Sequence, residues 1–85
     1  MFPLKILKAV ADATRLKLLG LIRQGEVCAC ELPSRAGVSQ PAVSQHLKVL
    51  KNVGLVCVRS QGAKRLYRIS AFGKLVLFDI GGWRS

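Results

Sequence analysis

A mainly helical fold with a small antiparallel β-hairpin is predicted from three features of this 85-residue sequence. Apolar residues recur every three or four positions in several segments up to residue 53, as they do on one side of a helix. At 55–70 two alternating segments flank a glycine, which is typical of a β-hairpin. A last apolar run covers 71–80. The predicted order is therefore α-α-β-α-α-β-β-α in one domain, residues 1–85.

Two helices are expected at the start of the chain, over residues 3–11 and 13–24. Asp12 is a good N-cap for the second helix, because its carboxylate accepts hydrogen bonds from backbone N–H groups of the first turn. Gly25 is expected to end that helix, since glycine is common just past a helix C-terminus. The apolar positions are Leu4, Leu7, Val10 and Ala11 on one side of the first helix and, facing the core, Leu16, Leu19 and Ile22 in the second.

A helix-turn-helix arrangement is expected over residues 29–53. Residues 31–36 suit a short helix that Gly37 stops, and a tight turn through Ser39 leads into the next helix. Two helices joined by a few residues that include a glycine are the usual form of this motif. Before it, residues 26–28 are expected to form a short strand that pairs with the returning strand of the hairpin.

The helix that begins after Ser39 is clearly marked at both ends. Ser39 is its predicted N-cap, Pro41 falls in the first turn where its missing N–H is harmless, and Gly54 ends it. One side is apolar and expected to be buried, through Val43, Leu47, Leu50 and Val53. The other side carries groups that can hydrogen-bond base edges or phosphates in a DNA major groove about 12 Å wide, namely Gln40, Ser44, Gln45, Lys48 and Lys51.

The hairpin at 55–70 is basic near its tip. It alternates through Val56, Cys57, Val58 and Arg59, turns at an expected Gln61-Gly62, and returns through Leu66, Tyr67, Arg68 and Ile69. Three cations gather near the turn, Arg59, Lys64 and Arg65. Beside a DNA-reading helix, such a hairpin is expected to be a wing that lies along the phosphate backbone. An ordinary solvated hairpin is the alternative. Together these elements predict a winged helix-turn-helix.

The charge balance points to a polyanionic partner. The net charge is +10, from 14 Lys and Arg against 4 Asp and Glu, and no acidic residue lies between Glu31 and Asp79. Solvated surfaces usually mix both signs, so this excess favours nucleic acid and binding that weakens with salt. An anionic membrane surface attracts the same charge, but the apolar runs are too short to span a bilayer. Three unevenly spaced cysteines and no expected secretory signal indicate a reducing cytoplasm.

Other function classes fit less well. One His, two Asp and two Glu, scattered along a basic chain, suggest no acid-base or nucleophile set, so we expect no enzyme. A thiol oxidoreductase would need CxxC spacing, whereas the sequence has Cys28-Ala-Cys30. The aromatic residues form no strand-borne stacking platform for single-stranded nucleic acid. A non-specific architectural DNA-binding protein stays open as an alternative, and the absence of a palindromic footprint would distinguish it.

Four strings in order, LKAVADATRLKLLGLI, GEVCACEL, SQPAVSQHLKVLKNVGLV and GAKRLYRIS, resemble the ArsR/SmtB family of winged-helix, metal-responsive repressors over roughly residues 4 to 70. The resemblance implies a homodimer that holds an operator in double-stranded DNA, without a cofactor, until an inducer ion or oxidant releases it. It places the dimer interface on the first and last helices, which carry the apolar residues Phe2, Leu4, Leu7, Leu75, Val76 and Phe78.

The DNA contacts are assigned by combining the helix pattern with this resemblance. The positions that match the family's DNA-reading helix are Ser39, Gln40, Ser44, Gln45 and His46. We expect Gln40, Ser44 and Gln45 to contact bases. The expected phosphate contacts are Lys48, Arg59, Lys64 and Arg65. His46 is interpreted as a packing or phosphate-contact residue rather than a metal ligand.

The inducer site is expected at Cys28 and Cys30, because two thiolates one residue apart can converge on one thiophilic ion such as As(III) or Sb(III). The family's arsenic sensors have a CxCxxC version of this segment, but Pro33 occupies the third position here. Cys57 is the only other cysteine and so the one candidate for a third thiolate, although the sequence does not show whether it approaches the pair. Asp79 is the only ligand-type side chain in the last helix, so a zinc site there is not expected.

Redox control through the same thiols is the alternative trigger. Cys28 and Cys30 could oxidise, or Cys30 could pair with Cys57. A disulfide within Cys-Ala-Cys closes a small ring, so a long-range or intersubunit bond is the expected form. Either oxidation would take place beside the helix-turn-helix and alter the position of the DNA-reading helix.

Overall fold

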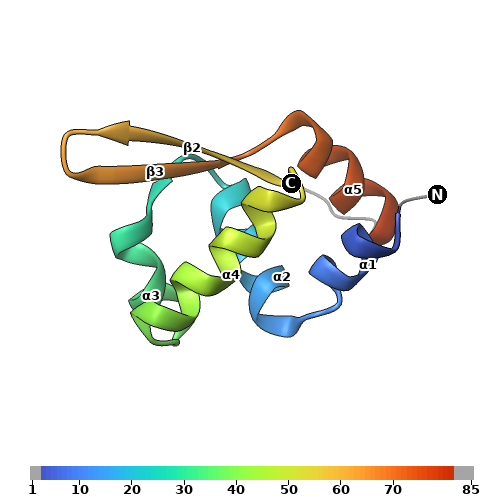
Figure 1. Cartoon of the computed structure of the whole chain (residues 1–85), viewed down its shortest axis with the longest axis horizontal. Helices are drawn as coiled ribbons and strands as arrows, with labels where there is room; N and C mark the ends of the chain where they lie inside the picture. The colour runs from blue at the N-terminus through green and yellow to red at the C-terminus, as the bar shows by residue number, and fades with distance from the viewer. Residues whose placement is uncertain (1–2, 82–85) are drawn as a thin grey trace.

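The computed structural model describes residues 3–81, so Phe2 and Trp83 lie outside the described part of the chain. Figure 1 shows a helical body with one long β-hairpin extending from it. The elements are α1 (Leu4–Val10), α2 (Ala13–Arg23), β1 (Val27–Cys28), the 3-10 turn η1 (Ala29–Glu31), α3 (Leu32–Ala36), α4 (Gln40–Asn52), β2 (Val56–Gln61), β3 (Lys64–Ile69) and α5 (Ala71–Gly81). The predicted order of helices and strands is confirmed, and the added element is η1.

Both predicted N-caps are present. The carboxylate of Asp12 accepts a hydrogen bond from the Arg15 amide at 3.0 Å, and this bond is the largest cause of the lowered pKa of Asp12. The hydroxyl of Ser39 accepts one from the Ala42 amide at 3.3 Å. Each cap satisfies an N–H group that has no partner within its helix, so the sequence locates the starts of α2 and α4 correctly.

The third helix begins differently from the prediction. The chain leaves β1 through the 3-10 turn η1, and α3 proper starts at Leu32 with Pro33 in its first turn. Proline suits that position because its missing N–H would have no helical partner there. Gly37 then adopts φ +72°, which confirms it as the residue that stops α3.

The sheet has three antiparallel strands in the order β1-β3-β2. Val27 of β1 and Val58 of β2 both lie opposite Tyr67 of β3, which confirms that the short strand pairs with the returning strand. The expected turn at Gln61-Gly62 is wrong by one residue. Gln61 still pairs with Lys64, so Gly62 and Ala63 form a two-residue loop. Gly62 supplies the positive φ, +61°, that such a loop requires.

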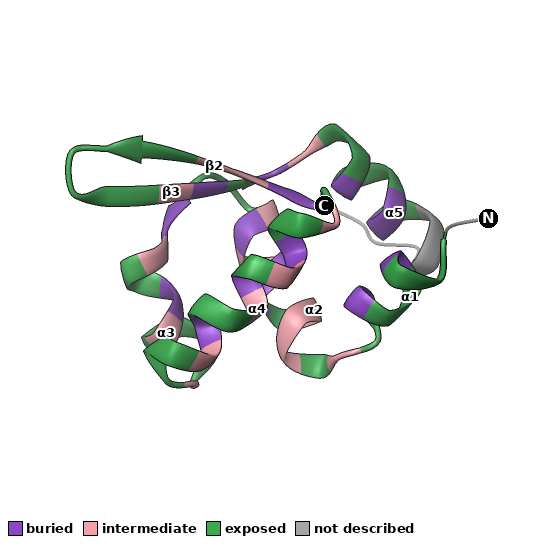
Figure 2. Ribbon diagram, viewed as in Figure 1, coloured by how far each residue is buried: buried purple, intermediate pink, exposed green. Residues whose placement is uncertain are grey.

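The core is shared by all the helices and the sheet, and Figure 2 shows the buried residues on the inward sides of the elements. In α2 Leu18 and Leu19 are fully buried, and Leu16 is partly buried and packs against the core, so Leu18 is a core position that the sequence analysis missed. In α1 the buried side is formed by Ile6, Ala9 and Val10, which leaves Leu4 and Leu7 exposed. The spacing of apolar residues does not distinguish these sides because leucines occur on both.

Helix α5 is anchored to the loop before β2. The amide of Ser70 donates to the carbonyl of Leu55 at 3.1 Å, and a side chain at Gly73 would collide with that same carbonyl. Glycine therefore allows α5 to pack directly on this backbone. In Figure 1, α5 and α1 lie at one end of the molecule and the tip of the β2–β3 hairpin lies at the other. No helix within residues 3–81 is both long enough and apolar enough to cross a membrane.

Candidate DNA-binding surface and cysteine site

The polar side of α4 is exposed, as the sequence predicts. Val43, Leu47 and Leu50 are buried in the core, so the opposite side of the helix faces outward. The exposed positions are Ser39, Gln40, Ser44, Gln45, Lys48 and Lys51. This row of hydrogen-bonding groups and cations, without an acidic residue, has the character of a helix that inserts into a DNA groove.

One pocket brings together three parts of the chain that are distant in sequence. Its volume is about 220 Å³. It is lined by Cys28, Ala29 and Cys30 at the β1–η1 junction, by Gln40, Val43 and Ser44 of α4, and by Ala63, Lys64 and Arg65 at the hairpin tip. The start of α4 and the basic tip of the hairpin therefore border the same pocket as the cysteine pair. This convergence could not be predicted from the sequence, because it depends on how β3 of the hairpin packs against β1 and η1.

Arg59 is engaged within the protein. Its Nε and one terminal nitrogen each donate to a carboxylate oxygen of Glu26 at 2.8 Å. The hydrogen bonds and charge of Arg59 lower the pKa of Glu26, and Glu26 in turn raises the pKa of Arg59. A bidentate pair of this kind competes with a phosphate for the same guanidinium donors. This ion pair argues against the phosphate contact predicted for Arg59, which stays a prediction.

His46 is half-buried and faces α2 rather than the exposed side of α4. Its Nδ1 lies 3.1 Å from a terminal nitrogen of Arg15. Arg15 also donates to the carbonyls of Ala9, at 2.7 Å, and Lys8, at 3.2 Å, at the end of α1. This supports the packing interpretation of His46 and separates it from the exposed residues of α4.

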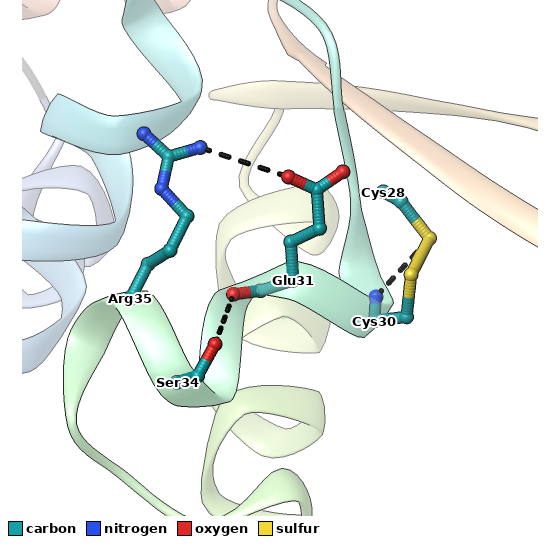
Figure 3. Close-up of a disulfide and its surroundings, with 5 residues drawn as sticks. All are labelled: Cys28, Cys30, Glu31, Ser34 and Arg35. Atoms are coloured by element: carbon teal, nitrogen blue, oxygen red, sulfur yellow. Dashed lines mark hydrogen bonds and ion pairs between the residues drawn. A yellow bond between two sulfur atoms is a disulfide. The ribbon is translucent and has the colours of Figure 1, made fainter.

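Cys28 and Cys30 form a disulfide, shown in Figure 3. Their Cα atoms are 5.2 Å apart, within the usual range for a disulfide, because the chain bends from β1 into η1 between them. The Cys30 amide also donates to the Cys28 sulfur, at 3.2 Å. The expected long-range bond between Cys30 and Cys57 is therefore wrong, while an intersubunit bond stays a prediction. Cys28 is 6% exposed, whereas Cys30 is on the surface.

Local contacts hold the segment that follows the disulfide. The hydroxyl of Ser34 donates to the carbonyl of Glu31 at 3.3 Å, and Arg35 lies 4.0 Å from the carboxylate of Glu31 one turn away (Figure 3). Exposed contacts of this kind add little stability. They link Glu31 at the end of η1 to Ser34 and Arg35 of α3.

Cys57 is half-buried, is not part of a disulfide and does not line the pocket. Cys57 lies opposite Arg68 and Cys28 lies opposite Leu66, so both point to the same side of the sheet. Cys28 is on β1 and Cys57 is on β2, the two outer strands of the sheet, and the β3 residues opposite them are two positions apart. Strand spacings of about 4.8 Å and a rise of about 3.4 Å per residue place their Cα atoms about 12 Å apart. Within the described residues, no group of three metal-binding side chains is assembled, with or without Cys57.

A second exposed surface is apolar. Leu4 is 65% exposed on α1, and Leu75 and Phe78 are 62% and 68% exposed on α5. Leu7, at 41%, extends the set. Val76 is fully buried instead, so it belongs to the core of this chain and not to the exposed surface predicted for the terminal helices. Exposed apolar side chains gathered at one end of a small protein commonly mark a surface that another protein covers.

Known proteins resemble this chain in sequence. Residues 12–58 match the family described as "Bacterial regulatory protein, arsR family". The arsenical resistance operon repressor of Staphylococcus xylosus is 42% identical over 65 residues, which are 76% of this chain and 62% of that protein. A putative arsenical resistance operon repressor of Halobacterium salinarum is 44% identical over 84 residues, covering 96% of this chain and 71% of that protein. This chain thus spans less than two thirds of the staphylococcal repressor.

Solved structures give the same picture of the fold. The homodimeric winged helix-turn-helix DNA-binding domain of Mb0332 from Mycobacterium bovis, described as a possible ArsR-family transcriptional regulator, superimposes with a TM-score of 0.79. It is 33% identical to this chain, and the match covers 89% of this chain and 70% of that one. The predicted winged helix-turn-helix fold is thereby confirmed.

Proposed function

This chain belongs to the ArsR family of bacterial regulatory proteins, and we propose that it is a transcriptional repressor whose hold on operator DNA is controlled at Cys28 and Cys30. The observation that carries the proposal is the pocket where the start of the exposed helix α4, the basic hairpin tip and the cysteine pair meet. DNA contact and chemical control are then properties of one region. As a regulator that binds operator DNA, the protein would act in the cytoplasm.

In this proposal α4 enters the major groove and the hairpin is the wing. Gln40, Ser44 and Gln45 read bases, because their amide and hydroxyl groups match the donors and acceptors of base edges. Ser39 and Lys48 on the helix and Lys64 and Arg65 on the wing contact phosphates. All seven side chains are exposed. A promoter with a two-fold repeat is the expected target, since a dimer presents α4 twice at a spacing near one DNA turn.

We place the dimer contact on α1 and α5. Leu4, Leu7, Leu75 and Phe78 expose apolar surface at the end of the molecule away from the wing tip. A second copy of this chain would cover that surface and leave both wings and both copies of α4 free. The homodimeric Mycobacterium bovis domain, which has the same fold at 33% identity, supports a homodimer, and the choice of α1 and α5 rests on their exposed apolar side chains.

The control step uses the reduced pair. As thiolates, Cys28 and Cys30 are soft ligands for As(III), Sb(III) or another thiophilic ion, and no cofactor is needed for DNA binding. Relatives that are arsenical resistance operon repressors favour this trigger. The pair supplies two sulfur ligands, whereas a third is not assembled within the described residues.

Oxidation is a second candidate for the trigger, and the disulfide between Cys28 and Cys30 favours it. Oxidation of two thiols to this disulfide releases two protons and two electrons to an oxidant, and a thiol reductant reverses it. The same two residues serve both triggers, so the choice between them depends on which reagent releases DNA.

Fluorescence anisotropy on a duplex from the promoter of the protein's own gene tests the proposal. Fully reduced protein is titrated anaerobically with arsenite in one arm and with a disulfide-forming oxidant in the other. Release is expected for the wild type and for Cys57→Ser, the matched control, but not for Cys28→Ser or Cys30→Ser. Release by arsenite identifies a metalloid sensor, and release by the oxidant alone identifies a redox sensor. Retained induction in both serine variants would contradict the proposed site.

A further inference from the structure

We propose that the pocket beside Cys28 and Cys30 is shared between inducer and DNA, so that a bound inducer and a bound operator exclude one another directly. This inference rests on the proposed function and specifies how the cysteine site controls it. Four of the nine pocket-lining residues are proposed DNA contacts, Gln40 and Ser44 on α4 and Lys64 and Arg65 on the wing. A ligand held by the cysteines therefore occupies the angle between helix and wing.

Two sulfur atoms set the chemical class of the ligand. Cys57 is about 12 Å away by sheet geometry and belongs to a different part of the sheet surface. Two thiols can bind a thiophilic atom that has two exchangeable ligands and keeps one permanent substituent. A monosubstituted trivalent arsenical fits this description. Its two hydroxyl groups leave as two water molecules while two arsenic–sulfur bonds form, and each cysteine thiol gives up its proton to a departing hydroxyl. The disulfide must first be reduced by a thiol reductant, which is itself oxidised.

The pocket has room for the substituent. Its volume of about 220 Å³ equals roughly seven water molecules at about 30 Å³ each, enough for a small organic group. Ala29, Val43 and Ala63 provide the apolar part of its lining. Because Cys30 is exposed while Cys28 is nearly buried, the ligand reaches the Cys30 sulfur first.

The apparent Kd for DNA depends on inducer concentration in one way if inducer and DNA exclude one another, and in another way if the inducer acts through a remote conformational change. When two ligands compete for one site, the apparent Kd for DNA rises in proportion to free inducer without limit. When they bind together with reduced affinity, the rise levels off at the coupling factor, typically about 5- to 150-fold. The two cases separate well above the concentration that saturates the cysteines.

The test uses the reduced full chain, the labelled promoter duplex and phenylarsine oxide as the probe. Thiol titration first gives the concentration that saturates Cys28 and Cys30. Above it, each tenfold rise in free probe is expected to raise the apparent Kd about tenfold. A plateau would overturn shared occupancy while leaving the cysteine sensor intact. No change in Kd, with the thiols fully occupied, would overturn both the sensor and this inference. Cys28→Ser/Cys30→Ser is the control and should show no response.

A second experiment tests whether bound operator DNA covers the pocket. Operator DNA in the pocket is expected to slow alkylation of Cys30 by a small neutral reagent at least tenfold. Cys57 is the internal reference, because it does not line the pocket, and its rate should change less than twofold. Equal rates for Cys30 with and without DNA would contradict the proposal, since the operator would then leave the pocket open.

Discussion

The guanidinium of Arg15 on α2 lies 3.1 Å from Nδ1 of His46 on α4. Arginine only donates hydrogen bonds, so Nδ1 is the acceptor in this contact. The same guanidinium donates to the carbonyls of Lys8 and Ala9, which end α1. Arg15 therefore connects a helix of the proposed dimer surface, through α2, to the helix proposed to read DNA. His46 is the point of contact on α4.

From this geometry, His46→Ala is expected to lower the free energy of unfolding without changing DNA sequence preference. The lost hydrogen bond is worth roughly 0.5–1.5 kcal/mol. Urea denaturation measures the first effect, and binding to operator duplexes with single base changes measures the second. Gln45→Ala is the comparison, because it should relax the preference at one position by about 1–3 kcal/mol. A similar relaxation in His46→Ala would mean that His46 reads a base.

The ion pair between Arg59 and Glu26 leads to a salt-dependence prediction. Each phosphate contact contributes about 0.9 to the slope of log K against log salt. Lys64→Ala should reduce the slope by about that amount per lost contact, whereas Arg59→Ala should leave it nearly unchanged. Glu26→Gln weakens the hold on Arg59 and should make the slope steeper. Anisotropy titrations at several salt concentrations provide the values, and equal losses in the Lys64 and Arg59 variants would show that Arg59 leaves Glu26 to bind DNA.

Replacing Phe78 with glutamate should convert the proposed dimer to a monomer while preserving the fold. Phe78 is 68% exposed, so a charge there is solvated in the single chain but would be buried without a partner in a dimer. Sedimentation equilibrium measures the mass, and circular dichroism checks the helix content. Lys74→Glu changes the charge at an exposed position of the same helix and is the control. A dimer that survives Phe78→Glu would place the contact elsewhere.

Gly73→Ala should destabilise the protein by about 1–3 kcal/mol, the usual cost of overpacking. The new methyl group meets the carbonyl of Leu55, which is backbone and cannot swing away. Urea denaturation at a fixed protein concentration gives the difference, because dimer formation makes stability concentration-dependent. Lys74→Ala, at an exposed position on the same helix, should stay within about 0.5 kcal/mol of the wild type. A neutral Gly73→Ala would show that α5 can shift away from the loop.

The features that the sequence predicts correctly are those that depend on residues close together in the chain. Asp12 and Ser39 act as caps through atoms three residues away, and Val43, Leu47 and Leu50 define a buried side by spacing alone. The exposed row on α4 follows from the same spacing. The positive φ of Gly37 and Gly54 reflects local backbone preference, which sequence also carries. The winged helix-turn-helix fold and the exposed polar side of α4 were therefore predictable.

Only the tertiary structure shows which residues from distant parts of the chain come into contact. Glu26 lies 33 positions from Arg59 and His46 lies 31 from Arg15, and no periodicity encodes such contacts. The path from β1 into η1 brings Cys28 to Cys30, and the sheet register keeps Cys57 away from both. Composition and local pattern specify which elements form, because their interactions span a few residues. The pocket joining cysteines, α4 and wing depends on how those elements pack, which is set by side-chain contacts between distant parts of the chain.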